Sequence, residues 1–154
     1  PRRSSPAARD RVRSGTSRGY ACTDDTCTQA LGADGRWATA GDGPGQFDGP
    51  GDKWSPETML VASVANCFIL TFRAVARASK FEWSSLTVEV DGVLDRIERQ
   101  TRFTEFYIDV TLHLPSGADA HKAHRLCEKS EQVCLVTNSL TGKKILSVAI
   151  VHDG

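Results

Sequence analysis

The sequence has no apolar run of about 20 residues, which a membrane-spanning helix needs, and no apolar segment typical of a secretory signal peptide. It also has no net charge, because 19 Lys and Arg balance 19 Asp and Glu. These absences give no support to a membrane protein or to a protein that binds nucleic acid through its overall charge. We therefore expect a cytoplasmic protein with no membrane partner and no nucleic-acid partner.

Regularly spaced cysteine pairs are also missing. The sequence has five cysteines, an odd number, and their spacing is not that of a disulfide framework. This indicates a reducing compartment and at most a few functional thiols. The length of 154 residues suffices for one domain with a hydrophobic core but is too short for two, and no segment repeats another.

Positive charge is concentrated at the N-terminus. The first 20 residues hold six Arg and one acidic residue, Asp10, and residues 1–14 have almost no large apolar side chains. Such a segment cannot build a core, so we expect residues 1–14 to be a disordered basic arm and residues 15–154 to form a single domain. The arm lacks aromatic residues that could stack on bases, which favours a solvated tail over a nucleic-acid contact.

A glycine-rich segment, 41–53, leads to the start of a long helix. Ser55 is a suitable N-cap, Pro56 fits the first helical position because its missing N–H costs nothing there, and Glu57 suits the first turn. Residues 59–72 carry no charge, and at about 1.5 Å per residue they cover only about two-thirds of a bilayer core. We therefore expect a helix that is buried on nearly all sides.

The spacing of apolar residues changes from helical to alternating beyond this helix. Residues 86–95 and 106–114 alternate between apolar and polar side chains and predict two β-strands. The short polar link 96–102 predicts that these strands pair as an antiparallel hairpin.

Three further segments complete the expected fold. Residues 118–140 predict a second helix, residues 143–151 predict a final short strand, and residues 18–40 predict about two or three more strands. Two helices and a mainly antiparallel sheet place the chain in the α+β class.

One cysteine, Cys67, falls within the long apolar helix. A buried free cysteine is by default a small hydrophobic residue. Three features favour chemistry over packing: Cys134 lies at the end of the second predicted helix, where it could move; Asn66 is a polar neighbour in an apolar run; and Glu57 opens the same helix, below the glycine-rich segment. None of the three is decisive alone.

A metal site is the alternative considered for His121, His124 and Cys127. These residues are spaced three apart on a predicted helix, and each step of three drifts by about 60° around the helix axis. Since the set also lacks a fourth ligand, we do not expect a metal ion there.

The segments "SPETMLVASVANCFILTFRAVAR" (55–77) and "EQVCLVTNSL" (131–140) hold the two cysteines singled out above, about 67 residues apart. They resemble two motifs of the OsmC/Ohr family (osmotically inducible protein C and organic hydroperoxide resistance proteins). In that family "PE", an apolar stretch and "CF" recur on a central helix, and a second cysteine follows, with Leu135 here in place of the usual proline. The resemblance covers about residues 45–150.

The resemblance implies an OsmC-like α+β fold with a mainly antiparallel sheet, a long buried central helix and a second helix, assembled as an interwoven homodimer. It also implies a thiol peroxidase. Cys67 would attack an organic hydroperoxide as the thiolate and become a sulfenic acid, and Cys134 would condense with it to a disulfide. An external dithiol such as dihydrolipoamide would reduce this bond, with no metal, haem or flavin cofactor. Cys127, one heptad before Cys134, is a rival for the second thiol.

A reactive Cys67 needs a positive neighbour, because free thiols have a pKa of about 8.5 and react as thiolates. The helix dipole cannot provide the charge, since Cys67 lies ten residues past Glu57, about 15 Å along the axis. Arg73 and Arg77 follow six and ten residues later and do not lie beside the thiol. The positive charge must come from elsewhere in the fold.

The resemblance implies that an arginine of the N-terminal strands supplies this charge, held by the glutamate that matches Glu57. "GTSRGYA" resembles the segment that carries it and nominates Arg18, with Arg36 in "DGRW" as the second candidate. For Glu57 the alternative role is simple stabilisation of the first helical turn.

The expected substrate is apolar. Trp54, Met59 and Phe68, near the expected mouth of the site, suit an alkyl or lipid hydroperoxide better than hydrogen peroxide. The alternative function is that of a non-catalytic protein of the same fold, which binds an apolar small molecule in the same pocket.

Overall fold

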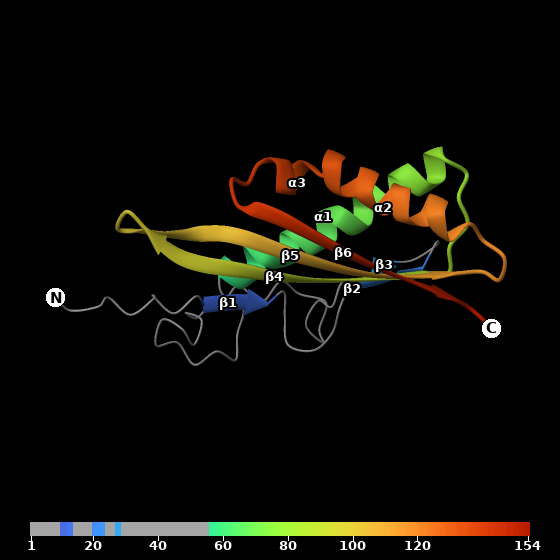
Figure 1. Ribbon diagram of the computed structural model, residues 1–154, viewed down its shortest axis with the longest axis horizontal. Helices are drawn as coiled ribbons and strands as arrows, with labels where there is room; N and C mark the ends of the chain where they lie inside the picture. Colours follow the sequence, from blue (N-terminus) through green and yellow to red (C-terminus); the bar gives the residue numbers. More distant parts are fainter. Residues whose placement is uncertain (1–9, 14–19, 24–26, 29–55) are drawn as a thin grey trace.

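The structure is a computed structural model and describes residues 10–13, 20–23, 27–28 and 56–154. These residues form a mixed β-sheet with helices packed on one face, in agreement with the predicted α+β class (Figure 1). The helices are α1 (Pro56–Ala78), α2 (Ala120–Val133) and α3 (Leu135–Asn138). The strands are β1 (Asp10–Arg13), β2 (Tyr20–Thr23), β3 (Cys27–Thr28), β4 (Ser85–Ile97), β5 (Gln100–Leu114) and β6 (Lys143–His152).

Within the described part of the chain the strands follow the order β3-β2-β4-β5-β6, and β1 pairs with a separate stretch of β4. Every pair is antiparallel except β5 with β6. The sheet is therefore mainly antiparallel, as expected. The parallel pair requires the chain to return to the other end of the sheet between β5 and β6, and α2 and α3 make that crossover.

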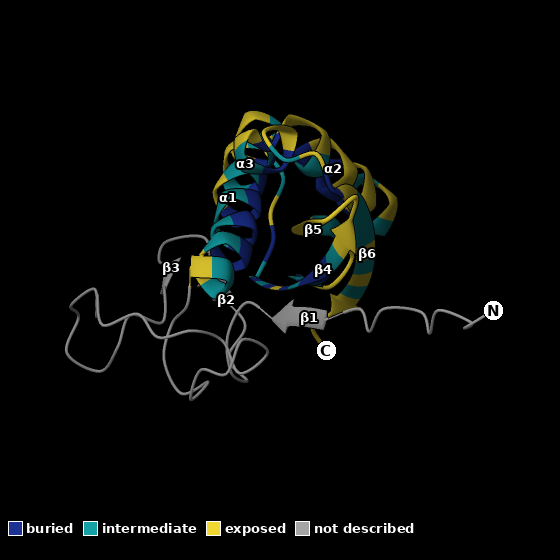
Figure 2. Cartoon of the chain, turned by 90° about the vertical axis from the view of Figure 1, so that its left-hand side faces the viewer, coloured by how far each residue is buried: buried dark blue, intermediate teal, exposed yellow. Residues whose placement is uncertain are grey.

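Helix α1 begins at Pro56, as the sequence predicts, while Ser55 lies outside the described residues. Figure 2 shows its buried side facing the interior of the domain. The other side carries Met59 and Leu70, which are 39% and 50% exposed. The expectation of a helix buried on nearly all sides is thus wrong for a single chain, because one sheet and two short helices cover only part of its circumference. By length and composition α1 could also cross a membrane, a test that core helices of globular proteins pass as well.

The predicted strands at 86–95 and 106–114 are confirmed as β4 and β5, and both are longer than predicted. They run through most of the predicted link and meet at a two-residue turn, Glu98 and Arg99. Both turn residues have left-handed φ angles, 50° and 69°, as a tight type I′ hairpin requires. The usual signal for this turn, Asn-Gly or Asp-Gly, is absent, so the sequence did not reveal it.

Gly92 in β4 allows α1 to approach the sheet closely. A Cβ atom at this position would lie 2.6 Å from the Phe103 ring and 2.8 Å from the Val61 side chain. The Phe103 ring stacks in turn on Phe106, with ring centroids 5.3 Å apart. The missing side chain thus lets the first turns of α1 pack against the aromatic residues of β5.

Strand β1 lies within the segment that was expected to be disordered. It pairs antiparallel with β4, with Arg11 opposite Val93. The prediction is therefore wrong for residues 10–13, because backbone hydrogen bonds to a neighbouring strand leave no trace in composition; residues 1–9 and 14 lie outside the described part. Two of the strands expected within residues 18–40 are β2 and β3, and the rest of that segment is also outside it.

The single helix predicted over residues 118–140 is interrupted. Helix α2 starts after Asp119, whose side chain accepts a hydrogen bond from the Lys122 backbone N–H at 2.9 Å. It ends at Val133, and Cys134 is extended before α3 begins. The final strand predicted over residues 143–151 is confirmed as β6.

Candidate active site

Cys67 lies in the middle of α1, at the border between the buried and the exposed side of the helix. It is half-buried, whereas the next residue, Phe68, is completely buried and Leu70 is 50% exposed. The Thr71 hydroxyl donates a hydrogen bond to the Cys67 carbonyl at 2.7 Å. Cys67 is thus held on a regular helix with part of its surface accessible.

Cys134 lies at the junction of α2 and α3, and its side chain is within hydrogen-bonding reach of the Cys67 side chain. Both residues are free cysteines. Cys134 is completely buried. The structure therefore brings together the two cysteines that the sequence nominated, one from α1 and one from the crossover, and leaves Cys67 the more accessible of the two.

Burial raises the pKa of the Cys134 thiol above its ordinary value, and the backbone N–H and hydroxyl of Thr137 offset part of that rise. The neighbouring Cys67 side chain raises the pKa of Cys134 further. Cys134 therefore holds its proton at neutral pH. Sequence reasoning missed Thr137, which is completely buried beside Cys134. Its only signal was a hydroxyl residue three positions after a helix boundary.

Glu57 lies in the first turn of α1 and is separated from Cys67 by ten positions on one continuous helix, about 15 Å along the axis. Its Oε2 atom is buried and has no hydrogen-bond partner within the described part of the chain. A buried carboxylate oxygen without a donor is costly, so this atom is a suitable partner for a cation. Arg18 and Arg36, the two candidates for that cation, lie outside the described residues, as does Trp54.

Cys127 is completely buried in the core between α2, α1 and the sheet. Burial, and then the charge of Glu128, raise its pKa to about 12. A thiol held in this way carries almost no thiolate at neutral pH. His121 and His124 are exposed, and His124 Nδ1 lies 3.5 Å from Glu128 Oε1. The three residues considered for a metal site therefore do not converge.

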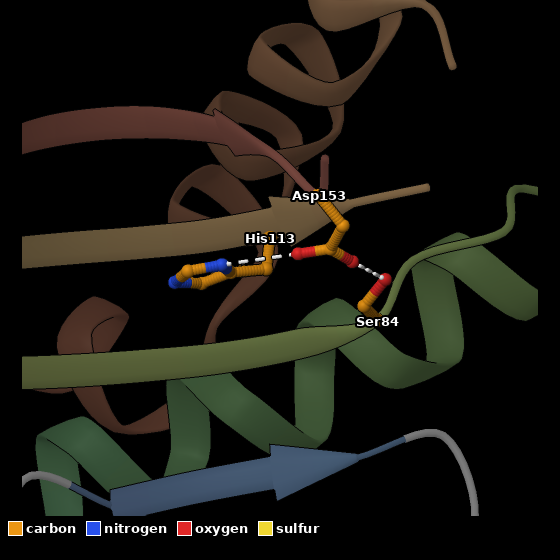
Figure 3. Close-up of polar contacts among 3 residues, drawn as sticks. All are labelled: Ser84, His113 and Asp153. Carbon is orange, nitrogen blue, oxygen red and sulfur yellow. Dashed lines mark hydrogen bonds and ion pairs between the residues drawn. The ribbon is translucent and has the colours of Figure 1, made fainter. Parts of the chain in front are cut away.

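A separate polar cluster joins the ends of three strands. Asp153, which follows β6, accepts a hydrogen bond from the Ser84 hydroxyl and lies 3.4 Å from His113 Nδ1 (Figure 3). The Ser84 hydroxyl and then His113 lower the pKa of Asp153. Because the carboxylate lies between the serine and the imidazole, His113 cannot take a proton from Ser84, and the cluster is not a hydrolytic triad. It fastens the end of β6 to β4 and β5.

A groove of about 350 Å³ lies between α2 and β6. Its lining residues are His124, Glu128, Glu131, Gln132, Leu146 and Val148. Neither Cys67 nor Cys134 lines it, so this groove is distinct from the candidate site.

The chain is similar to known sequences. The model of the OsmC-like protein family matches residues 49–148, well over half of the 154 residues. YmaD, an uncharacterised protein of Bacillus subtilis, is 29% identical over 102 residues, which make up 64% of this chain and 68% of YmaD.

Solved structures show the same fold. An organic hydroperoxide resistance protein from Elizabethkingia anophelis superposes with a TM-score of 0.60 at 22% identity, covering 72% of this chain and 78% of that protein. The organic hydroperoxide resistance protein OsmC from Legionella pneumophila superposes with a TM-score of 0.53 at 23% identity, covering 71% and 78%. Since the family model spans both cysteine segments up to the middle of β6, the chain belongs to the OsmC-like protein family.

Proposed function

We propose that the protein is a cysteine-based thiol peroxidase that reduces organic hydroperoxides to alcohols. The observation that carries this proposal is the contact between the Cys67 and Cys134 side chains, two free thiols, one on α1 and one at the junction of α2 and α3. Thiols already in contact can form a disulfide with little movement of the backbone. Two proteins of the same fold are named organic hydroperoxide resistance proteins, at 22% and 23% identity.

In the proposed cycle the Cys67 thiolate attacks one oxygen of the peroxide. The O–O bond breaks, the alkoxide takes up a proton and leaves as the alcohol, and Cys67 becomes a sulfenic acid. The Cys134 sulfur then attacks the sulfenic sulfur, water leaves, and a disulfide forms. An external dithiol such as dihydrolipoamide returns both cysteines to thiols by exchange and is itself oxidised to a disulfide. The cycle needs no metal or organic cofactor.

The difference in burial supports the assignment of the two roles. Cys67 is partly exposed and can meet a substrate, whereas Cys134 is completely buried and protonated. Cys134 can therefore react only with an immediate neighbour, which is what the second step requires. Of the apolar residues expected near the mouth of the site, Phe68 is completely buried and Met59 is 39% exposed on α1. The names of the two hydroperoxide resistance proteins support an organic hydroperoxide as the substrate.

We place Arg18, with Arg36 as the alternative, between Glu57 and Cys67. A guanidinium can hold a carboxylate with one edge and offer N–H groups to a sulfur with the other. It would satisfy the buried Oε2 atom of Glu57 and stabilise the Cys67 thiolate. Because Glu57 and Cys67 of one helix are about 15 Å apart, farther than one guanidinium spans, a site that contains both needs a second chain.

We also propose that the protein is a homodimer. Met59 and Leu70 remain exposed on α1 of a single chain, and a second copy would cover them. Sites shared between two chains would at the same time bring Glu57 of one chain closer to Cys67 of the other.

Peroxide consumption with dihydrolipoamide as reductant tests the proposed function. Cumene hydroperoxide and a fatty-acid hydroperoxide should be consumed faster than hydrogen peroxide. Cys67→Ser should abolish turnover, and Cys134→Ser should be oxidised once and stop at the sulfenic acid or a higher oxide. Cys127→Ala is the matched control and should keep cycling.

Multiple turnovers by Cys67→Ser would refute the proposed mechanism. A non-reducing peptide map supplies the second reading. If peroxide produces no Cys67–Cys134 disulfide while an apolar ligand raises the melting temperature, the protein is the non-catalytic binding protein instead.

A further inference from the structure

The chain turns at Cys134 although the sequence contains no helix breaker there. Residues 118–141 include neither glycine nor proline. The residues on both sides of Cys134 are helical, whereas Cys134 itself is extended, with φ −67° and ψ 119°. Interactions of side chains, and not the backbone preferences of glycine or proline, must therefore interrupt the helix.

Two side chains of α3 reach back across the break to the end of α2. The Thr137 hydroxyl lies 3.1 Å from the Cys134 carbonyl oxygen and 3.5 Å from the Glu131 carbonyl oxygen. The Asn138 side-chain amide donates a hydrogen bond to the Gln132 carbonyl at 2.9 Å. The Glu131 and Cys134 carbonyls also accept backbone N–H groups, from Cys134 at 3.3 Å and from Asn138 at 3.0 Å, so the Thr137 hydroxyl adds a second contact to each. The last carbonyl groups of a helix have no partner within it, and the Asn138 amide supplies one to Gln132. We call Thr137 and Asn138 together the α3 clasp.

The break also determines what Cys134 contacts. A continuous helix would carry the following residues farther along the axis of α2, by about 1.5 Å per residue. Instead the extended residue turns the chain so that α3 packs beside α1, with Val136 against the core and Thr137 completely buried. In this arrangement the Cys134 side chain meets Cys67.

We propose that Thr137 and Asn138 are positioning residues for disulfide formation: by holding Cys134 extended, they keep its sulfur beside that of Cys67. Their part in turnover rests on the proposed peroxidase function, but their effect on the Cys67–Cys134 disulfide does not. Without the clasp Cys134 spends part of its time in helical conformation, and the disulfide forms less readily.

The equilibrium constant of the disulfide in dithiothreitol redox buffers tests this without peroxide. Two protein thiols and oxidised dithiothreitol give the protein disulfide and reduced dithiothreitol, and peptide mapping after acid quenching measures the oxidised fraction. Thr137→Val and Asn138→Ala should each lower the constant about three- to fivefold, and the double variant should lower it about tenfold or more.

Two controls separate the clasp from general effects on α3. The Ser139 hydroxyl bonds to the Leu135 carbonyl at 2.8 Å, within α3 and not across the break. Ser139→Ala should therefore leave the constant within about twofold of the wild-type value. Thr137→Ser keeps the hydroxyl group and should also behave like the wild type.

A proline at position 135 should restore what the double variant loses. Leu135 is 79% exposed and is the first residue of α3, where a missing N–H costs little. Proline also disfavours the helical conformation of the residue before it, here Cys134. Leu135→Pro in the double variant should return the equilibrium constant to within about threefold of the wild-type value. If the double variant instead lost disulfide formation because its core packing was disturbed, a substitution at this exposed position would not restore the constant.

A wild-type constant in the double variant, the same loss in Ser139→Ala, or no rescue by Leu135→Pro would each overturn the proposal. If the double variant does not fold, the two single variants decide by the same fold-changes. If the α3 clasp variants lower the equilibrium constant but the wild type consumes no hydroperoxide, the proposed peroxidase function is refuted and the proposed role of the clasp stands. If the wild type consumes hydroperoxide but the clasp variants do not lower the equilibrium constant, the role of the clasp is refuted and the peroxidase function stands.

Discussion

Replacing Cys127 with alanine tests whether the thiol in the core is kept protonated by its burial. In the folded chain the pKa of Cys127 is raised from 9.0 to about 12, and in the unfolded chain it returns to its ordinary value. Between these two values the unfolded state loses a proton that the folded state keeps, so the free energy of unfolding falls as the pH rises. The loss is close to zero at pH 7 and reaches about 1.4 kcal/mol at pH 10.

Urea unfolding at pH 7 and pH 10 measures this difference. Between the two pH values the wild type should lose about 1.4 kcal/mol more stability than Cys127→Ala. All other ionisable side chains are the same in both proteins, so their contributions cancel in the comparison. An equal loss in both proteins would show that the core does not hold the proton on Cys127, and would refute the reasoning from burial.

Three further predictions concern activation, assembly and packing. Arg18→Ala should raise the pH at which iodoacetamide alkylates Cys67 by about one unit or more. Arg18→Lys should lose much of the peroxidase rate, because a lysine ammonium cannot bind the carboxylate and the sulfur through two N–H edges as a guanidinium can. A shift of the alkylation pH in Arg36→Ala alone would assign the role to Arg36. Light scattering at micromolar concentration should report the mass of two chains, and a monomer would contradict the proposed assembly. Gly92→Ala should lower the free energy of unfolding by about 1–3 kcal/mol, because the Phe103 ring must move to admit a Cβ atom; wild-type stability in urea would show that the ring has room to do so.

The start of α1 and the two long strands could be predicted from the sequence because their signals are local. A proline followed by a glutamate opens α1, and the uncharged run after them gives its length. In β4 and β5 the alternation of apolar residues gives the buried face directly, as at Leu86, Val88 and Val90. These patterns depend only on neighbours along the chain.

The candidate site could be predicted only in part. The sequence nominated Cys67 and Cys134, but their contact depends on the turn at Cys134, which no glycine or proline announces. That turn depends on hydrogen bonds from Thr137 and Asn138 to carbonyl groups that lie six residues earlier. Helical periodicity treats such residues as ordinary helix positions, so it predicts one helix where the structure has two.

The contact between Cys67 and Cys134 connects segments that are far apart in the chain. The residues between them contain the whole β4–β5 hairpin and α2, so a disulfide here would close a loop of about 67 residues. Closing such a loop lowers the entropy of the unfolded chain and would stabilise the oxidised form by about 4 kcal/mol over the reduced form. The protein would then resist proteases best just after it has met its substrate, and its rate of digestion would report its oxidation state.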